Sequence, residues 1–344
     1  MRRRDCLGSI ALGAAATLGG VMSGCRSGSS SARREKPLVR VAVVLTIHAA
    51  PLYLADELGY FDGAGLKVEI HRTNSDTEPI PLLATGQIDA AMETLTPAFV
   101  NTVAKGKHLR IVAGRLAATP TCSSTGTLFG NRNTFPTGLS DLRLLKGKRV
   151  GVTSATALSA FCLDMILAPA GLSAKDVNLV PLHQQESIAA LVAGKLDAIV
   201  VSQFDNDLEV MSPVVIRGTG LAKVFPNFQT GFLTFGPSLL EGDPRTGTNF
   251  LAAYLRGVDD FVAGKTPKFL DEYARSAQLD PEKLRQGCRD WFPKDGKIDP
   301  ANVGRWIDWM VARGFCPQKL DAAQLIDTRF IDAVESRKQA QAVI

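Results

Sequence analysis

Short apolar runs alternate with segments of helical spacing in the first third of the folded chain. Residues 38–45 (LVRVAVVL) are dominated by β-branched side chains, which is typical of a buried strand. Residues 52–59 have helical spacing and end on glycine. The same alternation predicts further strands at 66–71, 88–92 and 108–115, and further helices at 79–85 and 94–105.

This order restarts after a polar stretch, residues 117–140, which we interpret as the first crossing between two lobes. Beyond it the pattern predicts strands at 148–152, 177–181 and 198–201, with helices at 155–168 and 187–193. Alternating strands and helices favour mainly parallel sheets with helices on both faces. Two such blocks therefore predict two α/β lobes.

An internal echo supports the two blocks. The segment LATGQIDA at 83–90 is matched by LVAGKLDA at 191–198. In each, a helix ends on glycine and an aspartate precedes a strand. Residues 214–220 are expected to return the chain to the first lobe. The remaining pattern is helical and predicts a tail that packs on that lobe, with helices at 248–264, 267–277, 281–290, 301–313 and 321–339.

The N-terminus has the organisation of an export signal. Arginines at 2–4 precede an uncharged stretch at 6–24 that is too short and too glycine-rich for a membrane span, so residues 1–24 are predicted to be a signal peptide. RRDCL at 3–7 resembles the twin-arginine pattern. VMSGC at 21–25 resembles a bacterial lipobox, which predicts lipidation of Cys25 and a tether over 25–36; the alternative is an ordinary thiol behind a conventional cleavage site.

Charge and cysteine content narrow the possible functions. The formal charge of +5 falls to +3 once the three arginines and the aspartate of the signal are removed, so nothing supports nucleic-acid binding. Four cysteines remain, at 122, 162, 288 and 316. We expect either a disulfide between Cys288 and Cys316, which share the helical region, or buried free thiols. No spacing predicts a metal site.

The segment HAAPLYLADELGYF at 48–61 carries a family resemblance. Together with 83–90, LKGKRVGV at 145–152 and 191–198, it resembles periplasmic binding proteins of the nitrate, sulfonate, taurine and thiamine-pyrimidine-precursor type. The resemblance implies a type II periplasmic-binding fold. Lobe 1 would comprise 37–117 and 216–344, lobe 2 would comprise 118–215, and each would be a mainly parallel sheet flanked by helices, with a hinge that closes the lobes on a ligand.

The same resemblance implies a function. The chain would be the solute-binding component of an ABC importer, an exported lipoprotein at the periplasmic or cell surface, monomeric and without a cofactor, whose partners are a small molecule, a permease and its ATPase. Two alternatives remain. One is an enzyme on this fold, of desulfinase or pyrimidine-synthase type, although the loop after the first strand has no cysteine and the cysteine cluster of the synthases is missing. The other is a sensor that presents its ligand to a membrane receptor.

Ligands of open α/β sheets bind beyond the carboxyl ends of the strands. The candidate ligand-binding residues are those that follow the predicted strands: Thr46, His48, Asn74, Ser75, Asp76, Glu93, Thr94, Thr153, Ser154, Thr156, Gln203 and Phe204.

Their chemistry leaves the ligand open. Hydroxyl groups at helix N-termini suit an anion such as a sulfonate, nitrate or carboxylate, unless they only cap helices. The carboxylates count against an anion and keep a neutral or cationic pyrimidine-like molecule equally open. His48 is expected to offer either a donor or an acceptor. NSDTEP at 74–79 replaces the glycine-rich loop that is common in the family.

Overall fold

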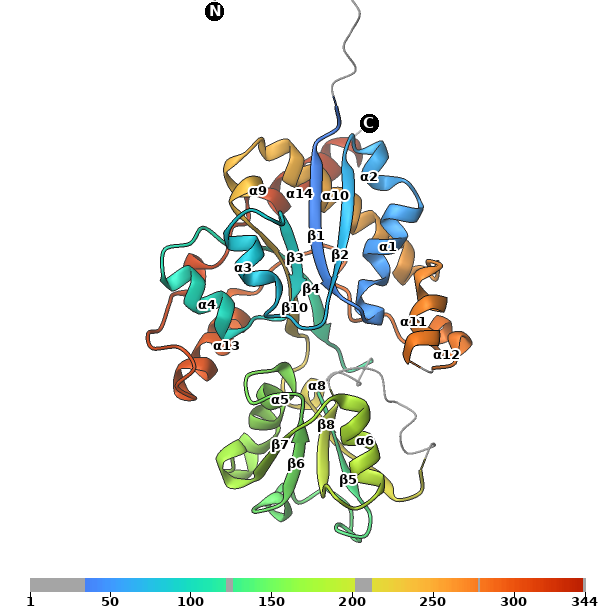
Figure 1. Cartoon of the computed structure of the whole chain (residues 1–344), viewed down its shortest axis with the longest axis vertical. Helices are drawn as coiled ribbons and strands as arrows, with labels where there is room; N and C mark the ends of the chain where they lie inside the picture. Colours follow the sequence, from blue (N-terminus) through green and yellow to red (C-terminus); the bar gives the residue numbers. More distant parts are fainter. Residues whose placement is uncertain (1–34, 122–125, 202–211, 278, 343–344) are drawn as a thin grey trace, which may run out of the picture. The chain divides into compact units, whose positions relative to one another are not determined.

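The computed structural model describes residues 35–121, 126–201, 212–277 and 279–342, and these contain two five-stranded sheets (Figure 1). The first sheet has the order β2-β1-β3-β10-β4 and consists of β1 (Leu38–Val44), β2 (Lys67–Thr73), β3 (Ala90–Glu93), β4 (Arg110–Ala118) and β10 (Phe228–Phe235). The second has the order β7-β6-β8-β5-β9 and consists of β5 (Thr127–Asn131), β6 (Arg149–Val152), β7 (Asn178–Pro181), β8 (Ala198–Val201) and β9 (Val215–Gly220). The predicted α/β architecture with two sheets is confirmed.

The two sheets share one strand arrangement. In each, a central strand is parallel to its two neighbours, β1 to β2 and β3, and β6 to β7 and β8, and an antiparallel strand occupies the fourth place: β10 between β3 and β4, and β5 between β8 and β9. The chain passes between the sheets from β4 to β5 and from β9 to β10. The polar stretch 117–140, predicted to be a crossing, includes β5. The return predicted at 214–220 is wrong, because β9 pairs with β5 and the chain reaches the first sheet only with β10.

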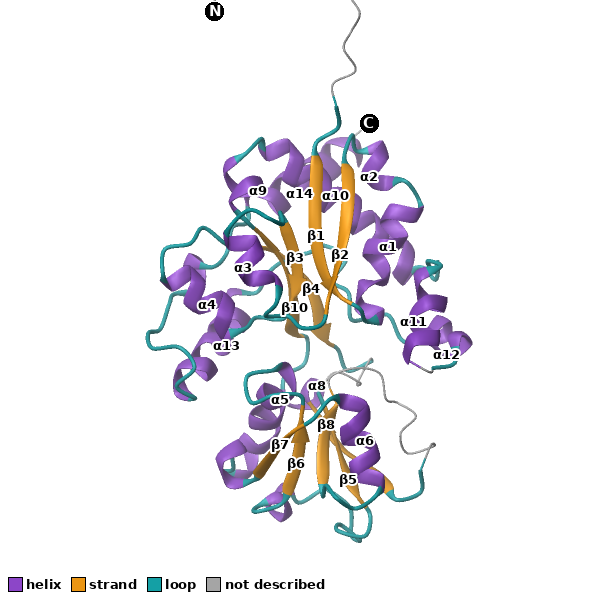
Figure 2. Cartoon of the chain, in the orientation of Figure 1, coloured by secondary structure: helices purple, strands orange, loops and turns teal. Residues whose placement is uncertain are grey.

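Helices flank both sheets (Figure 2). Those that follow strands of the first sheet are η1 (Ile47–Ala49), α1 (Ala50–Glu57), α2 (Tyr60–Gly63), α3 (Pro79–Ala84) and α4 (Pro97–Ala104). Those of the second sheet are η2 (Leu142–Leu145), α5 (Leu158–Leu167), η3 (Ala168–Ala170), η4 (Ala174–Asp176), α6 (Gln184–Val192) and α8 (Leu221–Val224). Among the helices described, none combines the length and apolar character that a membrane span needs.

The C-terminal tail is helical, as predicted. It consists of α9 (Pro237–Glu241), α10 (Pro244–Val262), α11 (Phe269–Ala277), α12 (Pro281–Gln286), α13 (Pro300–Ala312), η5 (Ala322–Gln324) and α14 (Arg329–Ala342). Three of these helices begin at an Asp-Pro pair, in which the aspartate accepts a backbone N–H of the first turn and the proline occupies the first helical position. Helix α10 packs on α1, and α14 packs on α10 and β4, so the tail covers the first sheet.

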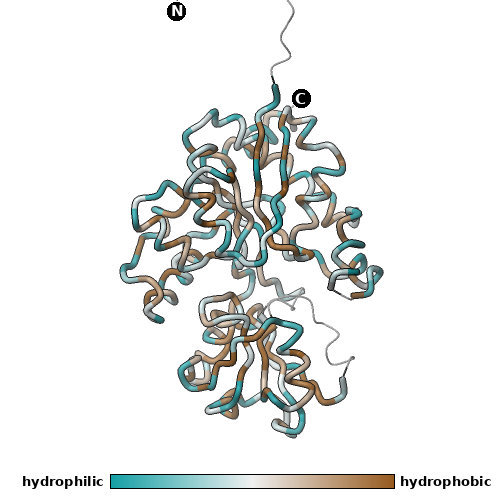
Figure 3. Tube along the Cα trace, in the orientation of Figure 1, coloured by the Kyte–Doolittle hydropathy of each residue, from teal (hydrophilic) through white to brown (hydrophobic). Residues whose placement is uncertain are grey.

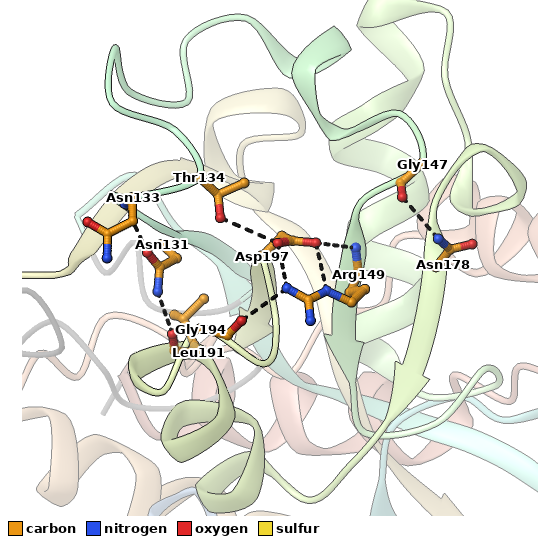
Figure 4. A network of polar contacts seen from close by, with 9 residues as sticks. All are labelled: Asn131, Asn133, Thr134, Gly147, Arg149, Asn178, Leu191, Gly194 and Asp197. Carbon is orange, nitrogen blue, oxygen red and sulfur yellow. Dashed lines mark hydrogen bonds and ion pairs between the residues drawn. The ribbon is translucent and has the colours of Figure 1, made fainter.

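The sequence echo at 191–198 corresponds to a partly buried ion pair in the second sheet (Figure 4). Asp197 accepts hydrogen bonds from the backbone N–H of Arg149 at 2.8 Å and from its guanidinium at 2.9 and 3.1 Å, while the guanidinium also donates to the carbonyl of Gly194 at 3.0 Å. Gly194 has φ +69°, a conformation that glycine adopts at little cost. The pair joins the start of β6 to the turn before β8.

The first sheet contains the same arrangement. Asp89 accepts from the backbone N–H of Arg40 at 2.8 Å and from its guanidinium at 3.0 and 3.1 Å, and that guanidinium donates to the carbonyl of Gly86 at 3.3 Å. Gly86 has φ +71°. The pair joins the start of β1 to the turn before β3. We call these two arrangements the Arg-Asp clamps. Both clamps use an arginine, an aspartate and the carbonyl of a glycine, which explains why the glycine and the aspartate are repeated in the sequence.

Hydrophobic stretches occur in the regions of both sheets (Figure 3). One buried cluster includes residues from both, with Phe161 of α5 stacked on Trp306 of α13 at 4.1 Å between ring centroids. Close by, the indole N–H of Trp309 donates to the buried carboxylate of Asp164 at 2.7 Å. Helix α5 is therefore held to the tail by aromatic packing and by a hydrogen bond to a charged acceptor.

The predicted disulfide between Cys288 and Cys316 is wrong. Cys316 is a buried free thiol, as is Cys162. Cys288 is disulfide-bonded, and its partner lies outside the described residues. The two cysteines pack against different apolar clusters, Cys316 with the one that contains Trp306 and Cys288 with the one that contains Tyr254. A shared helical region therefore does not bring their sulfur atoms together.

Candidate ligand-binding site

A small cavity of about 40 Å³ lies where β1, β3 and β4 meet the loops of the first sheet. Its lining residues are Val43, Val44, Thr46, His48, Asp76, Met92, Thr94, Arg115, Leu116, Leu158 and Thr230. Four of the predicted ligand-binding residues, Thr46, His48, Asp76 and Thr94, are therefore brought together. A fifth, Glu93, precedes Thr94 and is only 1% exposed.

His48 is positioned by the short helix η1 directly after β1. Its ring is buried and stands edge-on to Trp291, with 5.4 Å between ring centroids. Its carbonyl oxygen accepts a hydrogen bond from Arg115 Nη1 at 3.1 Å. Burial, followed by the charge of Arg115, lowers the pKa of His48 to about 3. The imidazole is therefore neutral at physiological pH and offers one donor and one acceptor.

Asp76 and Thr94 meet across the cavity. The hydroxyl of Thr94, just after β3, donates to Asp76 Oδ2 at 2.7 Å. Burial raises the pKa of Asp76, while the Thr94 hydrogen bond and the charge of Arg115 act in the opposite direction. Asp76 is therefore a partly buried carboxyl group that accepts from Thr94 and lines the cavity.

Glu93 is the last residue of β3. Its Oε1 accepts from the hydroxyl of Thr234 on β10 at 3.2 Å, and its Oε2 has no hydrogen-bond partner within the described part of the chain. Burial and, next, the charge of Asp76 raise the pKa of Glu93 well above its ordinary value. The folded protein therefore favours the protonated acid of Glu93 more than an exposed glutamic acid is favoured in water.

Arg115 was not among the sequence candidates. It lies inside β4 and is 6% exposed, and its Nε has no hydrogen-bond partner among the residues described. Burial lowers the pKa of Arg115, but guanidinium groups ionise so far above neutrality that it stays charged. The sequence did contain a signal: Arg115 is the single charged residue in the apolar run 111–118. Because the predicted strand ended at Arg115, the sequence did not indicate that this residue lies inside a buried strand.

Asn74 and Ser75 do not line the cavity. The backbone N–H of Asn74 donates to the carboxylate of Glu78 at 2.7 Å, and Ser75 Oγ lies 3.2 Å from Thr77 Oγ1. Both residues are exposed. They close the turn that leads into α3.

The predicted second-lobe residues lie between β6 and α5, outside the cavity lining. The backbone N–H and hydroxyl of Thr153 bond to Ser159 Oγ at 3.0 and 2.9 Å, and Ser154 Oγ lies 3.3 Å from Thr156 Oγ1. From this side, α5 contributes Leu158 to the cavity. Gln203 and Phe204, like Cys25 and the signal peptide, lie outside the described residues.

The alternative that these hydroxyl residues cap helices is wrong. The N-cap residue is Ala157 for α5, Thr96 for α4 and Glu78 for α3. Only Thr96 of these three accepts a first-turn N–H through its side chain in the described chain, from Phe99 at 3.3 Å. The hydroxyls of Thr94 and Thr153 therefore serve other contacts.

A second, more open hollow of about 850 Å³ lies beside β9 and includes Thr127, Leu139, Ile166, Arg217 and Lys223 among its lining residues. It contains none of the predicted residues, whereas Asp76 and Arg115 line the smaller cavity. The smaller cavity is therefore the candidate ligand site. Across the described residues, no group of three His, Cys, Asp or Glu side chains could hold a metal ion.

Two mixed sheets with polar strand ends define this chain as a two-lobed α/β protein with the type II periplasmic-binding fold. Solved structures support this class: the aliphatic sulphonate binding protein SsuA of Escherichia coli matches with a TM-score of 0.67 at 15% identity, over 84% of this chain and 97% of that one. This is the fold of solute-binding components of ABC import systems.

The chain belongs to the NMT1/THI5-like family, which it matches over residues 46–266. A protein of Haemophilus influenzae named for thiamine biosynthesis is 33% identical over 275 residues, 80% of this chain and 79% of that protein. A 4-amino-5-hydroxymethyl-2-methylpyrimidine phosphate synthase of Aspergillus parasiticus is 28% identical over 155 residues, 44% of this chain and 42% of that one. The resemblance seen in the sequence is confirmed at the level of family and fold.

Proposed function

We propose that this protein is the solute-binding component of an ABC importer and that its ligand is an uncharged or cationic pyrimidine-like molecule. The observation that carries the proposal is the charge at the cavity: one buried cation, Arg115, interacts with the charges of two carboxyl groups, Asp76 in the lining and the buried Glu93 behind it.

Charge arithmetic disfavours an anion. If both carboxyl groups were ionised, the set would carry a net charge of −1, and with one of them protonated it is neutral. A sulfonate, nitrate or carboxylate would therefore enter a buried site that has no net positive charge to offset its own, which is costly in a medium of low dielectric constant. An uncharged ligand meets no such penalty, and a cation is attracted.

A pyrimidine-like ring also suits the hydrogen-bonding groups. Asp76 can accept from an exocyclic amino group, and the hydroxyl of Thr46 or the neutral imidazole of His48 can donate to a ring nitrogen. The Haemophilus influenzae relative, named for thiamine biosynthesis, supports a ligand of this class. Delivery to a permease and its ATPase, from an exported monomer that is anchored by a lipid on Cys25, completes the proposal.

Binding without turnover is part of this proposal. The named synthase of Aspergillus parasiticus makes catalysis the second candidate function, but its similarity covers less than half of this chain. Incubation of the purified protein with candidate pyrimidines and analysis of the mixture by mass spectrometry separates the two. A new product that depends on the protein would favour the enzyme.

The direct test is a thermal-shift and calorimetric comparison of 4-amino-5-hydroxymethyl-2-methylpyrimidine, taurine and nitrate. A pyrimidine at one hundred times its dissociation constant should stabilise the protein by about 2.7 kcal/mol. Asp76→Asn should weaken its binding, whereas Ser75→Ala, in the neighbouring exposed position, should not. Stabilisation by taurine or nitrate, without an effect of the pyrimidine, would contradict the proposal.

A further inference from the structure

Glu93 is a buried carboxyl group that the proposed binding function does not yet use. It does not line the cavity, but its chain neighbour Thr94 does, and so do Asp76 and Arg115, whose charges interact with its own. Any effect of Glu93 on a ligand therefore passes through the charge of this set. Glu93 is a positioning residue rather than a contact.

Three groups act on the carboxyl of Glu93: Asp76 after β2 and Arg115 on β4 through their charges, and Thr234 on β10 through its hydroxyl. Arg115 in turn interacts with Tyr254 on α10 and with the neutral His48 on η1. Arg115 is the single cation among them. Glu93 Oε2, Arg115 Nε and Tyr254 Oη are all buried without a hydrogen-bond partner in the part of the chain described. The set is therefore neutral when one of its two carboxyl groups holds a proton.

We propose that Glu93 determines the charge class of the ligand by keeping the combined net charge of this set and its ligand constant. An uncharged ligand binds without proton exchange, and a cationic ligand binds with release of the Glu93 proton to solvent. This inference rests on the proposed binding function, and it specifies how the same site admits two charge states of one ligand class.

The proton balance of the step is simple. When the cation enters, the O–H bond at the Glu93 carboxyl breaks, the proton passes to buffer, and the new carboxylate offsets the added positive charge. An anion would need the opposite exchange, with a proton taken up by Asp76. This protonation removes the negative charge of Asp76 that interacts with Arg115, so an anion gains less. Burial raises the pKa of Glu93, so its carboxyl group retains a proton before binding, and the positive charge of the ligand then favours release of that proton.

The test is isothermal titration calorimetry at pH 7 in two buffers of different ionisation enthalpy. The probes are 4-aminopyrimidine, which is mainly uncharged, and its N-methylated pyrimidinium salt, whose charge does not titrate. The cation should release about one proton, and the neutral probe about none. In Glu93→Gln the release should disappear and the affinity for the cation should fall about tenfold or more, with little change for the neutral probe.

Two controls keep the result interpretable. Glu69→Gln, an exposed site on β2, should behave like the wild type. Infrared spectroscopy of the unliganded protein should show a protonated carboxyl band that Glu93→Gln removes. Binding of the cation without proton release, release that persists in Glu93→Gln, or an infrared spectrum without this band would each overturn the inference. If neither probe binds, the proposed function fails, while the infrared result still decides the state of Glu93.

Discussion

The two halves of this protein share a strand arrangement but differ in the polar groups at the carboxyl ends of their strands. Both sheets place a parallel trio beside an antiparallel strand, and both carry an Arg-Asp clamp in the same position. At the carboxyl ends of the strands they diverge. The first half gathers the buried Glu93 and Arg115 beside the partly buried Asp76, whereas the described loop of the second half, 153–156, presents hydroxyl groups.

This difference separates the residues that maintain the fold from those that provide chemistry. The clamps recur because each half needs the same connection: β1 to the turn before β3 in the first half, and β6 to the turn before β8 in the second. The buried charges do not recur, so the connectivity of the sheet does not require them. Because the two halves share a fold and only the first has the buried charges, a mutation in the first half can be compared with one at the corresponding position of the second.

The largest expected effect comes from the arginines on corresponding strands, β4 and β9. Arg115→Met leaves the buried Glu93 and the partly buried Asp76 without their cation and should lower the free energy of unfolding by about 3–5 kcal/mol at neutral pH. Arg217→Met, which removes a guanidinium that stacks 4.9 Å from the Phe129 ring, should cost about 1 kcal/mol or less. Urea denaturation measures both. Equal losses would show that the halves do not differ in buried charge.

The clamps should differ by less. Asp89 has a side chain that is 3% exposed and also accepts from Ser238 Oγ at 2.6 Å, so Asp89→Ala should destabilise by about 3 kcal/mol. Asp197 is 12% exposed and its partner Arg149 is 47% exposed, so Asp197→Ala should cost about 1–2 kcal/mol. The same denaturation experiment applies. A larger loss for Asp197→Ala would contradict the ranking by burial.

The hydroxyl groups test the ligand site itself. Thr94→Val removes a donor to the partly buried Asp76 carboxyl group and should weaken binding of the pyrimidine by about tenfold. Thr156→Val, in the second half, should change the affinity by less than about threefold, because its hydroxyl bonds to Ser154 and does not line the cavity. Calorimetric titration of both variants decides. A dominant effect of Thr156 would place the ligand nearer α5.

The smallest effect should be a pH dependence of opposite sign in the two halves. Hydrogen bonds from Arg149 lower the pKa of Asp197, so its stabilisation is present above the ordinary value of 3.8 and is lost as pH falls through the lowered value. The pKa of Glu93 is raised, so its folded state holds a proton longer and stability falls as pH rises above 4.5. In melting profiles against pH, Asp197→Asn should flatten the acid side and Glu93→Gln the neutral side. Unchanged slopes would refute these assignments.

Much of the fold was predictable from local pattern. Helix ends at glycine and runs of β-branched residues located the strands β1, β3 and β8 to within about two residues. The antiparallel strands β5 and β10 were missed, because their partners lie far away in the chain and their own sequences contain glycine and threonine. Pairing over such distances is set by tertiary contacts, and the misplaced return at 214–220 has the same cause.

The site was predictable in part for the same reason. Thr46, His48, Asp76 and Thr94 follow strands directly, so the rule that ligands bind beyond strand ends located them. Arg115 lies within β4, where that rule does not apply. The pairing of Cys288 was also beyond local pattern, because it depends on which residues the fold brings together.

The Arg-Asp clamps lie at the amino ends of β1 and β6, and the cavity lies past the carboxyl end of β1. Thr46 is six positions after Arg40, which in an extended chain is about 20 Å. Substitutions in the loops can therefore accumulate over evolution without weakening the contacts that keep each sheet assembled. This separation gives a physical reason why one fold occurs in proteins whose names refer to sulphonates in one case and to thiamine in another.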